Sequence, residues 1–271
     1  MIRVPSSLRP WGAIGALVAA VFALWMFFFP EYIPVHFAWN VQPRMAQAFI
    51  GAGYVFRVFF FLLFVFVADW RLLRWSYVGN LFFTGALLLA TLWHAEDMHW
   101  RSLVGHLWIV FYTMEPVIMH FSVPRGAADR GEPVTSGGPI LPWFRRFLIV
   151  EVAITGLFGL ALIINPEWLN TRWPWELNAF DARIVSAWWV GWAGWAAAMI
   201  QVADWDEVRL AAIGNLILGI SLTVINVVFY PYFNHAHPTV RAYILGVIVL
   251  TAGMAFFYWQ QERQRGRRAT Q

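Results

Sequence analysis

Apolar residues in this chain gather into long runs separated by short polar segments, and this pattern gives the first structural prediction. Eight runs are present, at about residues 11–29, 46–68, 75–95, 102–121, 145–165, 183–203, 209–231 and 239–259. Each approaches the ~20 residues that an α-helix needs to cross ~30 Å of hydrocarbon. Hydrocarbon offers no partner to free backbone groups, so runs of this length should be helical. The pattern therefore predicts an all-α integral membrane protein with eight transmembrane helices.

The positions of Arg residues predict how the chain sits in the membrane. Arg3 and Arg9 precede the first run, which ends at Phe27-Phe28-Phe29-Pro30-Glu31 without a small-residue cleavage site. We therefore expect a retained span in place of a cleaved signal peptide. With the N-terminus inside, thirteen Arg residues lie in the cytoplasm against five outside, which favours a plasma-membrane protein with both termini cytoplasmic.

A self-match within the chain predicts an internal duplication. Residues 67–81 recur at 202–216, with eight of fifteen positions identical at an offset of 135 residues. Four spans per unit return the chain to the side it left, so the halves should run parallel. We expect two tandem four-helix repeats, packed as bundles side by side. Their bounds are 1–121 and 145–259, with a Pro/Gly-rich cytoplasmic linker at 122–144 and a basic tail at 260–271.

The repeated stretch contains polar residues that suit a structural role. In each copy an Asp ends one span, an Arg opens the next five residues later, and a Gly-Asn pair follows. We expect Asp–Arg pairing across a tight turn and Asn hydrogen bonds between helices, since such bonds hold membrane helices together. The residues concerned are Asp69, Arg74 and Asn80 in the first copy and Asp204, Arg209 and Asn215 in the second.

Three charged residues fall inside the apolar runs: Arg57, Glu115 and Glu151. A lone charge at mid-bilayer costs at least ~2.5 kcal/mol, so these side chains should face one another or a cavity. One interpretation is a buried clamp between helices, and the other is a proton or substrate site. At the repeat offset Arg57 corresponds to Trp192 and Glu115 to Leu250, so the charges belong to one half only. This asymmetry favours a functional role.

Tryptophan and histidine provide further candidate sites. Trp188, Trp192 and Trp195 follow helical spacing and could stack on a planar or cationic ligand, although helix packing is the alternative. Histidines near the outer face could bind a metal or haem if two loops in equivalent positions converge, although neither loop is a recognised metal signature. The histidines are His94 and His99 in one loop, and His235 and His237 in the other.

Composition and absent motifs limit the functional classes. Hydrophobic residues make up 60% of the 271 residues and charged residues 13%, against roughly 25% charge in soluble domains. The net charge of +4 comes from Arg in loops and the tail and does not indicate nucleic-acid binding. No Cys is present, which excludes disulfides and Cys nucleophiles. Hydrolase, nucleotide and dinucleotide motifs are also absent, so the sequence does not favour an enzyme.

The leading hypothesis is a small-solute or proton-coupled transporter with a buried Arg/Glu site between the repeats. One alternative is a metal- or haem-binding redox protein that uses the histidines of the outer face. Another is a non-catalytic scaffold or complex subunit. The expected partners are the lipid bilayer, a small-molecule ligand and a homo-oligomer or complex partner, and the sequence identifies no cofactor.

Overall fold

The computed structural model describes residues 3–122 and 137–269, and within them the protein is all-α. Each predicted apolar run lies in a long helix. Six of these helices are long and apolar enough to cross a membrane: α1 (Leu8–Phe28), α3 (Arg44–Phe66), α4 (Arg74–Trp93), α6 (Pro142–Ile164), α9 (Trp205–Val228) and α10 (Thr239–Ala269). Two more long helices are α5 (Leu103–Ser122) and α8 (Ala179–Val202), and two short ones are α2 (Ile33–His36) and α7 (Pro166–Asn170).

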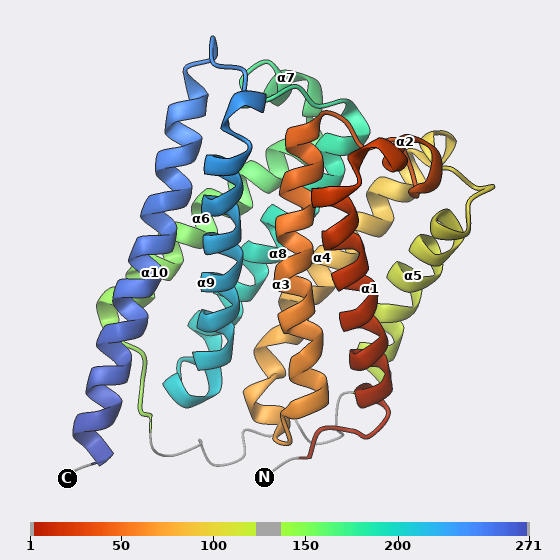
Figure 1. Ribbon diagram of the computed structural model, residues 1–271. Helices are drawn as coiled ribbons and strands as arrows, with labels where there is room; N and C mark the ends of the chain where they lie inside the picture. Colours follow the sequence, from red (N-terminus) through yellow and green to blue (C-terminus); the bar gives the residue numbers. More distant parts are fainter. Residues whose placement is uncertain (1–2, 123–136, 270–271) are drawn as a thin grey trace.

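The long helices pack in a pattern that joins the two halves of the chain. Helix α3 packs against α9, and α4 packs against α8, so each of these pairs contains one helix from each half. Helices α1 and α6 cover α3 and α8, while α5 and α10 lie against α4 and α9. Figure 1 shows the central helices flanked by α10 and α6 on one side and by α1 and α5 on the other. The halves therefore interlock, where the sequence predicted two separate bundles side by side.

Small residues allow the closest of these approaches, between α4 and α8. A Cβ added at Gly79 would lie 2.0 Å from the Trp195 ring, and one added at Gly194 would lie 2.8 Å from the Gly79 Cα. Neither position therefore has room for a side chain. This use of small residues between membrane helices is the role that the sequence suggested for the Gly-Asn pair that follows Arg74.

The two ends of the molecule differ. Helix α1 begins and α10 ends at the same end, and α2 and α7 lie at the other (Figure 1). The predicted tail at 260–271 starts as a continuation of α10, which remains helical to Ala269. Of the predicted linker at 122–144, positions 123–136 lie outside the described residues, and α6 already begins at Pro142.

Candidate functional site

The first buried site is centred on Arg57 in the middle of α3. Its guanidinium group forms an ion pair with Glu115 of α5, and Nη1 donates to Asn80 Oδ1 of α4 at 2.5 Å. Arg57 is 1% exposed, and both Glu115 and Asn80 are fully buried. The prediction that the charges face one another is confirmed for this pair. Three helices thus combine to neutralise a charge that the hydrocarbon would not tolerate alone.

Aromatic rings enclose the Arg57 site. The guanidinium carbon lies 4.3–5.0 Å from the ring centroids of Phe60, Phe61 and Phe83, which is the range of cation–π contact. On α8, Trp188 packs 4.4 Å from Phe83, measured between ring centroids. Trp195 packs 4.5 Å from Phe56. Two residues of the tryptophan stripe therefore form the wall of this site, as core packing that excludes water.

Two polar atoms in the Arg57 site have no hydrogen-bond partner among the described residues. They are Glu115 Oε2 and Asn80 Nδ2. Buried polar atoms are nearly always paired, so such exceptions indicate strain, function or a missing solvent molecule. Next to them, the hydroxyl groups of Tyr54 and Tyr112 lie 3.0 Å apart in a buried hydrogen bond. The site thus combines a fixed ion pair with unused hydrogen-bonding capacity.

The second buried site is centred on Glu151 of α6. Its Oε1 accepts hydrogen bonds from Trp192 Nε1 of α8 at 2.9 Å and from Asn215 Nδ2 of α9 at 3.0 Å. Glu151 is fully buried, and its Oε2 has no partner in the described part of the chain. The structure thus separates Glu151 from Arg57 and Glu115, with which the sequence grouped it, and places it with Trp192 and Asn215.

The charge balance of the Glu151 site differs from that of the Arg57 site. No described Arg or His side chain forms an ion pair with Glu151. Its two donors, an indole and a primary amide, are both neutral. A buried carboxyl group without a nearby cation is more stable in the protonated, uncharged form, because burial penalises the charge. The Glu151 site can therefore hold a proton, which the Arg57 site disfavours on Glu115.

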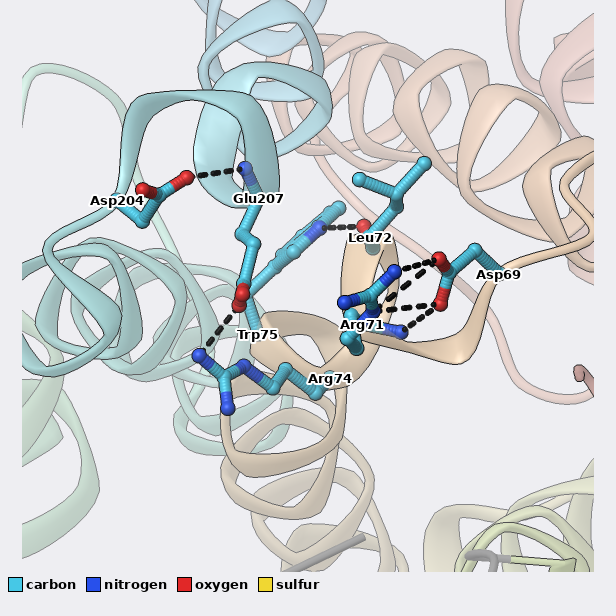
Figure 2. A network of polar contacts seen from close by, with 7 residues as sticks. All are labelled: Asp69, Arg71, Leu72, Arg74, Trp75, Asp204 and Glu207. Atoms are coloured by element: carbon cyan, nitrogen blue, oxygen red, sulfur yellow. Dashed lines mark hydrogen bonds and ion pairs between the residues drawn. The ribbon is translucent and has the colours of Figure 1, made fainter. Parts of the chain in front are cut away.

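The repeated Asp–Arg turns do not pair as the sequence predicted. Figure 2 shows that Asp69 binds Arg71, with 2.6 Å between Asp69 Oδ2 and Arg71 Nη2, while Arg74 extends to Glu207 of the other half. The short 3-10 turn Trp70–Leu72 brings Arg71 back to the carboxylate, so the predicted Asp69–Arg74 pair does not form. Arg74 instead links α4 to α9.

In the second half, Asp204 acts as the N-cap of α9. Its Oδ1 accepts from the Glu207 backbone N–H at 3.3 Å, and Arg209 lies 3.9 Å from Glu262 of α10. Burial raises the pKa of Asp204 above its ordinary value. Burial would also raise the pKa of Asp69, but hydrogen bonds from Arg71 outweigh it and lower that pKa. The two equivalent carboxyl groups thus titrate in opposite directions.

The outer histidines form separate contacts. His94 lies between Asp97, at 3.1 Å, and Arg183, at 2.6 Å. His99 contacts the Phe37 carbonyl at 3.0 Å, and His237 contacts Thr239 and the Thr171 carbonyl. His235 packs 4.6 Å from the Tyr230 ring centroid. In the described part of the chain, no three His, Cys, Asp or Glu side chains are placed to hold a metal ion, so the metal hypothesis gains no support.

Sequence reasoning missed Asp181, a fully buried carboxyl group that joins the halves. It accepts from Trp39 Nε1 at 2.8 Å, from Asn178 Nδ2 at 2.7 Å and from the Gln42 backbone N–H at 3.2 Å. Asn178 also caps α8 by accepting from the Asp181 N–H at 2.7 Å. The Asn-x-x-Asp spacing before an apolar run is a helix-start signal that could have drawn attention to it.

Six apolar helices and two polar sites buried among them define a polytopic membrane protein that contacts the lipid bilayer. Comparisons with protein-family models, curated proteins and solved structures found no match. The function must therefore be argued from the sites themselves.

Proposed function

We propose that this protein is a proton-coupled transporter of a small solute, and that Glu151 is its proton-binding group. The observation that carries the proposal is a fully buried carboxyl group with two neutral donors on one oxygen and no partner on the other. Ionisable residues at membrane depth are rare and mark proton or substrate pathways in pumps and transporters. The site has the chemistry that proton exchange requires.

Helix α8 connects the proton site to the Arg57 site. Trp192 binds Glu151 on one side of α8, while Trp188 and Trp195 pack against the aromatic wall around Arg57. Loss of the proton from Glu151 would create a buried negative charge, which favours a rotation or shift of α8 or an influx of water. Such a movement would also alter the Arg57 site, and this link is the proposed route of coupling.

A two-repeat arrangement with eight spans is part of the proposal, over residues 1–121 and 145–259. It is supported by the interlocking of α3 with α9 and of α4 with α8. Two backbone hydrogen bonds of the first half also recur in the second, 135 or 136 residues later. The pairs are Val4 N to Ala68 O with Ile140 N to Ala203 O, and His99 N to Ala38 O with Asn234 N to Pro174 O.

The membrane orientation is likewise proposed, with both termini in the cytoplasm of a cell bounded by its plasma membrane. Its support is the excess of Arg on the segments that lie at the terminal end of the molecule. Helices α5 and α8 are included as spans because their 20 and 24 residues match the length of their neighbours.

Proton movement through purified protein tests the proposal. The protein is reconstituted into vesicles containing a pH-sensitive dye, and a potassium gradient with valinomycin drives protons inward in the presence of a mixture of small solutes. Wild-type protein should acidify the lumen, and Glu151→Gln should abolish this flux, because an amide cannot exchange the proton. Glu96→Gln removes an exposed carboxylate outside the long helices and should leave the flux unchanged.

Two results would contradict the proposal. If Glu151→Gln carries protons as fast as the wild type, then Glu151 is not the proton-binding group. If the wild type carries none with any solute or potential, then the protein is not a proton-coupled transporter of these solutes. Elution of the variants as wild-type-like particles on size-exclusion chromatography checks that they are folded.

A further inference from the structure

Two hollows of different chemistry meet at the end of the molecule that carries α7. The first is an apolar groove of about 550 Å³ between α6, α8 and α10, lined by residues such as Leu157, Phe158, Val247 and Leu250. The second is a polar hollow of about 520 Å³ lined by the loop after α7 and by residues of both halves. Trp173 lines both, so the two spaces share a wall.

The apolar groove is open because small residues line it. A Cβ added at Gly246 of α10 would meet no atom within 4 Å. At the repeat offset of 135 residues Gly246 corresponds to Phe111, whose ring stacks on Trp11 with centroids 4.7 Å apart. Ala161 also lines the groove and corresponds, at the offset of 136, to Trp25. The first half thus carries large aromatic side chains where the second half leaves space for an apolar chain.

The polar hollow carries groups that bind hydroxyls. Its lining includes the amide side chains of Gln42, Asn170, Asn178 and Asn234, together with the exposed carboxylate of Glu176. Trp173 and Trp175 also line it, are 4% and 1% exposed, and have indole Nε1 atoms without a described partner. Amides, a carboxylate and indole rings together suit a sugar, whose hydroxyls donate and accept and whose ring face packs on aromatic surfaces.

The charges nearby disfavour a phosphate. The chain has no Lys, and no Arg is among the described residues that line the polar hollow. Arg172 lines the apolar groove, where its Nη1 donates to the Trp168 carbonyl at 3.1 Å and to Thr171 Oγ1 at 2.9 Å. Its guanidinium group also stacks on the Trp168 ring. Phosphate recognition depends on positioned Arg or Lys donors, and none is directed to the hollow.

We propose that the two spaces together bind one glycolipid from the membrane, with the acyl chain in the apolar groove and the uncharged sugar head group in the polar hollow. The groove opens on the helices that face lipid, so the ligand enters from the bilayer. Binding of this kind needs no contact with Arg57, Glu115 or Glu151, and it stands independently of proton transport.

Native mass spectrometry of the purified full chain tests this site. The protein is titrated with monoglucosyl-diacylglycerol and, separately, with phosphatidylglycerol of the same acyl chains. We expect the glucosyl lipid to bind at least about 10-fold more tightly. Gly246→Phe should fill the groove with the ring found at the equivalent position and weaken glucosyl-lipid binding at least about 10-fold. Gly85→Phe is the matched control, because Gly85 of α4 is also open to space and lines neither hollow.

The head group is tested separately by Asn234→Ala, which should weaken binding of the glucosyl lipid and leave that of phosphatidylglycerol unchanged. Equal affinity for the two lipids in the wild type would overturn the sugar assignment. Unchanged glucosyl-lipid binding in Gly246→Phe would overturn the groove as the chain site. If Gly246→Phe does not fold, Ala242→Phe fills the same groove from an exposed position on α10 and decides the question in its place.

Discussion

Glu115 and Glu151 are both fully buried, and each lies beside an Asn that opens the third span of its half, yet their surroundings differ in one decisive respect. In the first half, the residue at the α3 position is Arg57, a cation that forms an ion pair with Glu115. In the second half, the equivalent position on α8 is Trp192, which gives Glu151 only a neutral indole N–H. The same location therefore holds a fixed charge in one half and a protonatable group in the other.

This difference shows how a duplicated framework can be given one structural and one functional polar centre. The asparagines Asn80 and Asn215 bind in both halves, Asn80 to Arg57 and Asn215 to Glu151. Exchange of Arg for Trp at one position removes the counter-charge while keeping a donor. The carboxyl group is then free to gain and lose a proton, provided that the protein allows water or a solute to reach it.

The same substitution at both carboxyl groups should separate the two roles and gives the largest expected effect. Glu115→Gln leaves Arg57 buried without a counter-charge and should lower the free energy of unfolding by about 3–5 kcal/mol. Glu151→Gln replaces a protonated carboxyl by a similar neutral group and should cost less than about 1.5 kcal/mol. Reversible unfolding in mixed detergent micelles, followed by circular dichroism, measures both values.

A double variant is the control for that comparison. Arg57→Met combined with Glu115→Leu removes both charges and should recover most of the stability lost in Glu115→Gln, because a buried ion pair can often be replaced by apolar residues without loss. Equal costs for Glu115→Gln and Glu151→Gln would mean that the two carboxyl groups share one ionisation state, and the contrast between the halves would be lost.

The ion pairs at the terminal end of the molecule offer a second contrast of intermediate size. Glu207 is 1% exposed and binds Arg74 of the other half, whereas the Arg209–Glu262 pair spans 3.9 Å and both side chains are about one-third exposed. Glu207→Gln should lower the free energy of unfolding by about 1.5–3 kcal/mol. Glu262→Gln should cost at most about 1 kcal/mol, because solvent screens the pair. The same unfolding experiment compares them, and a larger cost for Glu262→Gln would contradict the assignment of Arg74 as the main link between halves.

The sequence predicted the helices well because their cause is local. Apolar runs of sufficient length have no alternative to helix in hydrocarbon, and α3, for example, begins at Arg44 where the run was expected from about residue 46. The Arg57–Glu115 pair also followed from the cost of a lone buried charge. Helices α5 and α8 were harder to classify, because His, Glu, Asp and Arg side chains reduce their apolar character.

The partners of single side chains could not be predicted, because they depend on helix rotation and on contacts far apart in the chain. Glu151 binds Asn215, 64 residues away, and its depth in the membrane says nothing of the direction in which it points. The predicted Asp69–Arg74 pair failed for a local reason, since a 3-10 turn placed Arg71 closer. Packing of four central helices decided the rest, and no spacing rule contains that information.

The smallest expected effect comes from Asp69 and Asp204, which occupy equivalent positions and titrate in opposite directions. The lowered pKa of Asp69 means that its charge stabilises the fold above the unfolded-state value of ~3.9, and that this stability is lost as the pH falls. The raised pKa of Asp204 means the opposite. Its protonated form stabilises the fold at low pH, and that stability is lost as the pH rises through the folded-state pKa.

Asn substitutions at the two positions should therefore have opposite signs at neutral pH. Asp69→Asn should destabilise the protein by at most about 1 kcal/mol near pH 7, and the deficit should shrink towards about pH 3. Asp204→Asn keeps the side-chain oxygen that caps α9 and removes an unfavourable charge, so it should be neutral or slightly stabilising near pH 7. Melting temperatures in detergent across this pH range measure both. If both variants destabilise equally at neutral pH, the two halves do not differ in the environment of this carboxyl group, and the contrast would be confined to the membrane interior.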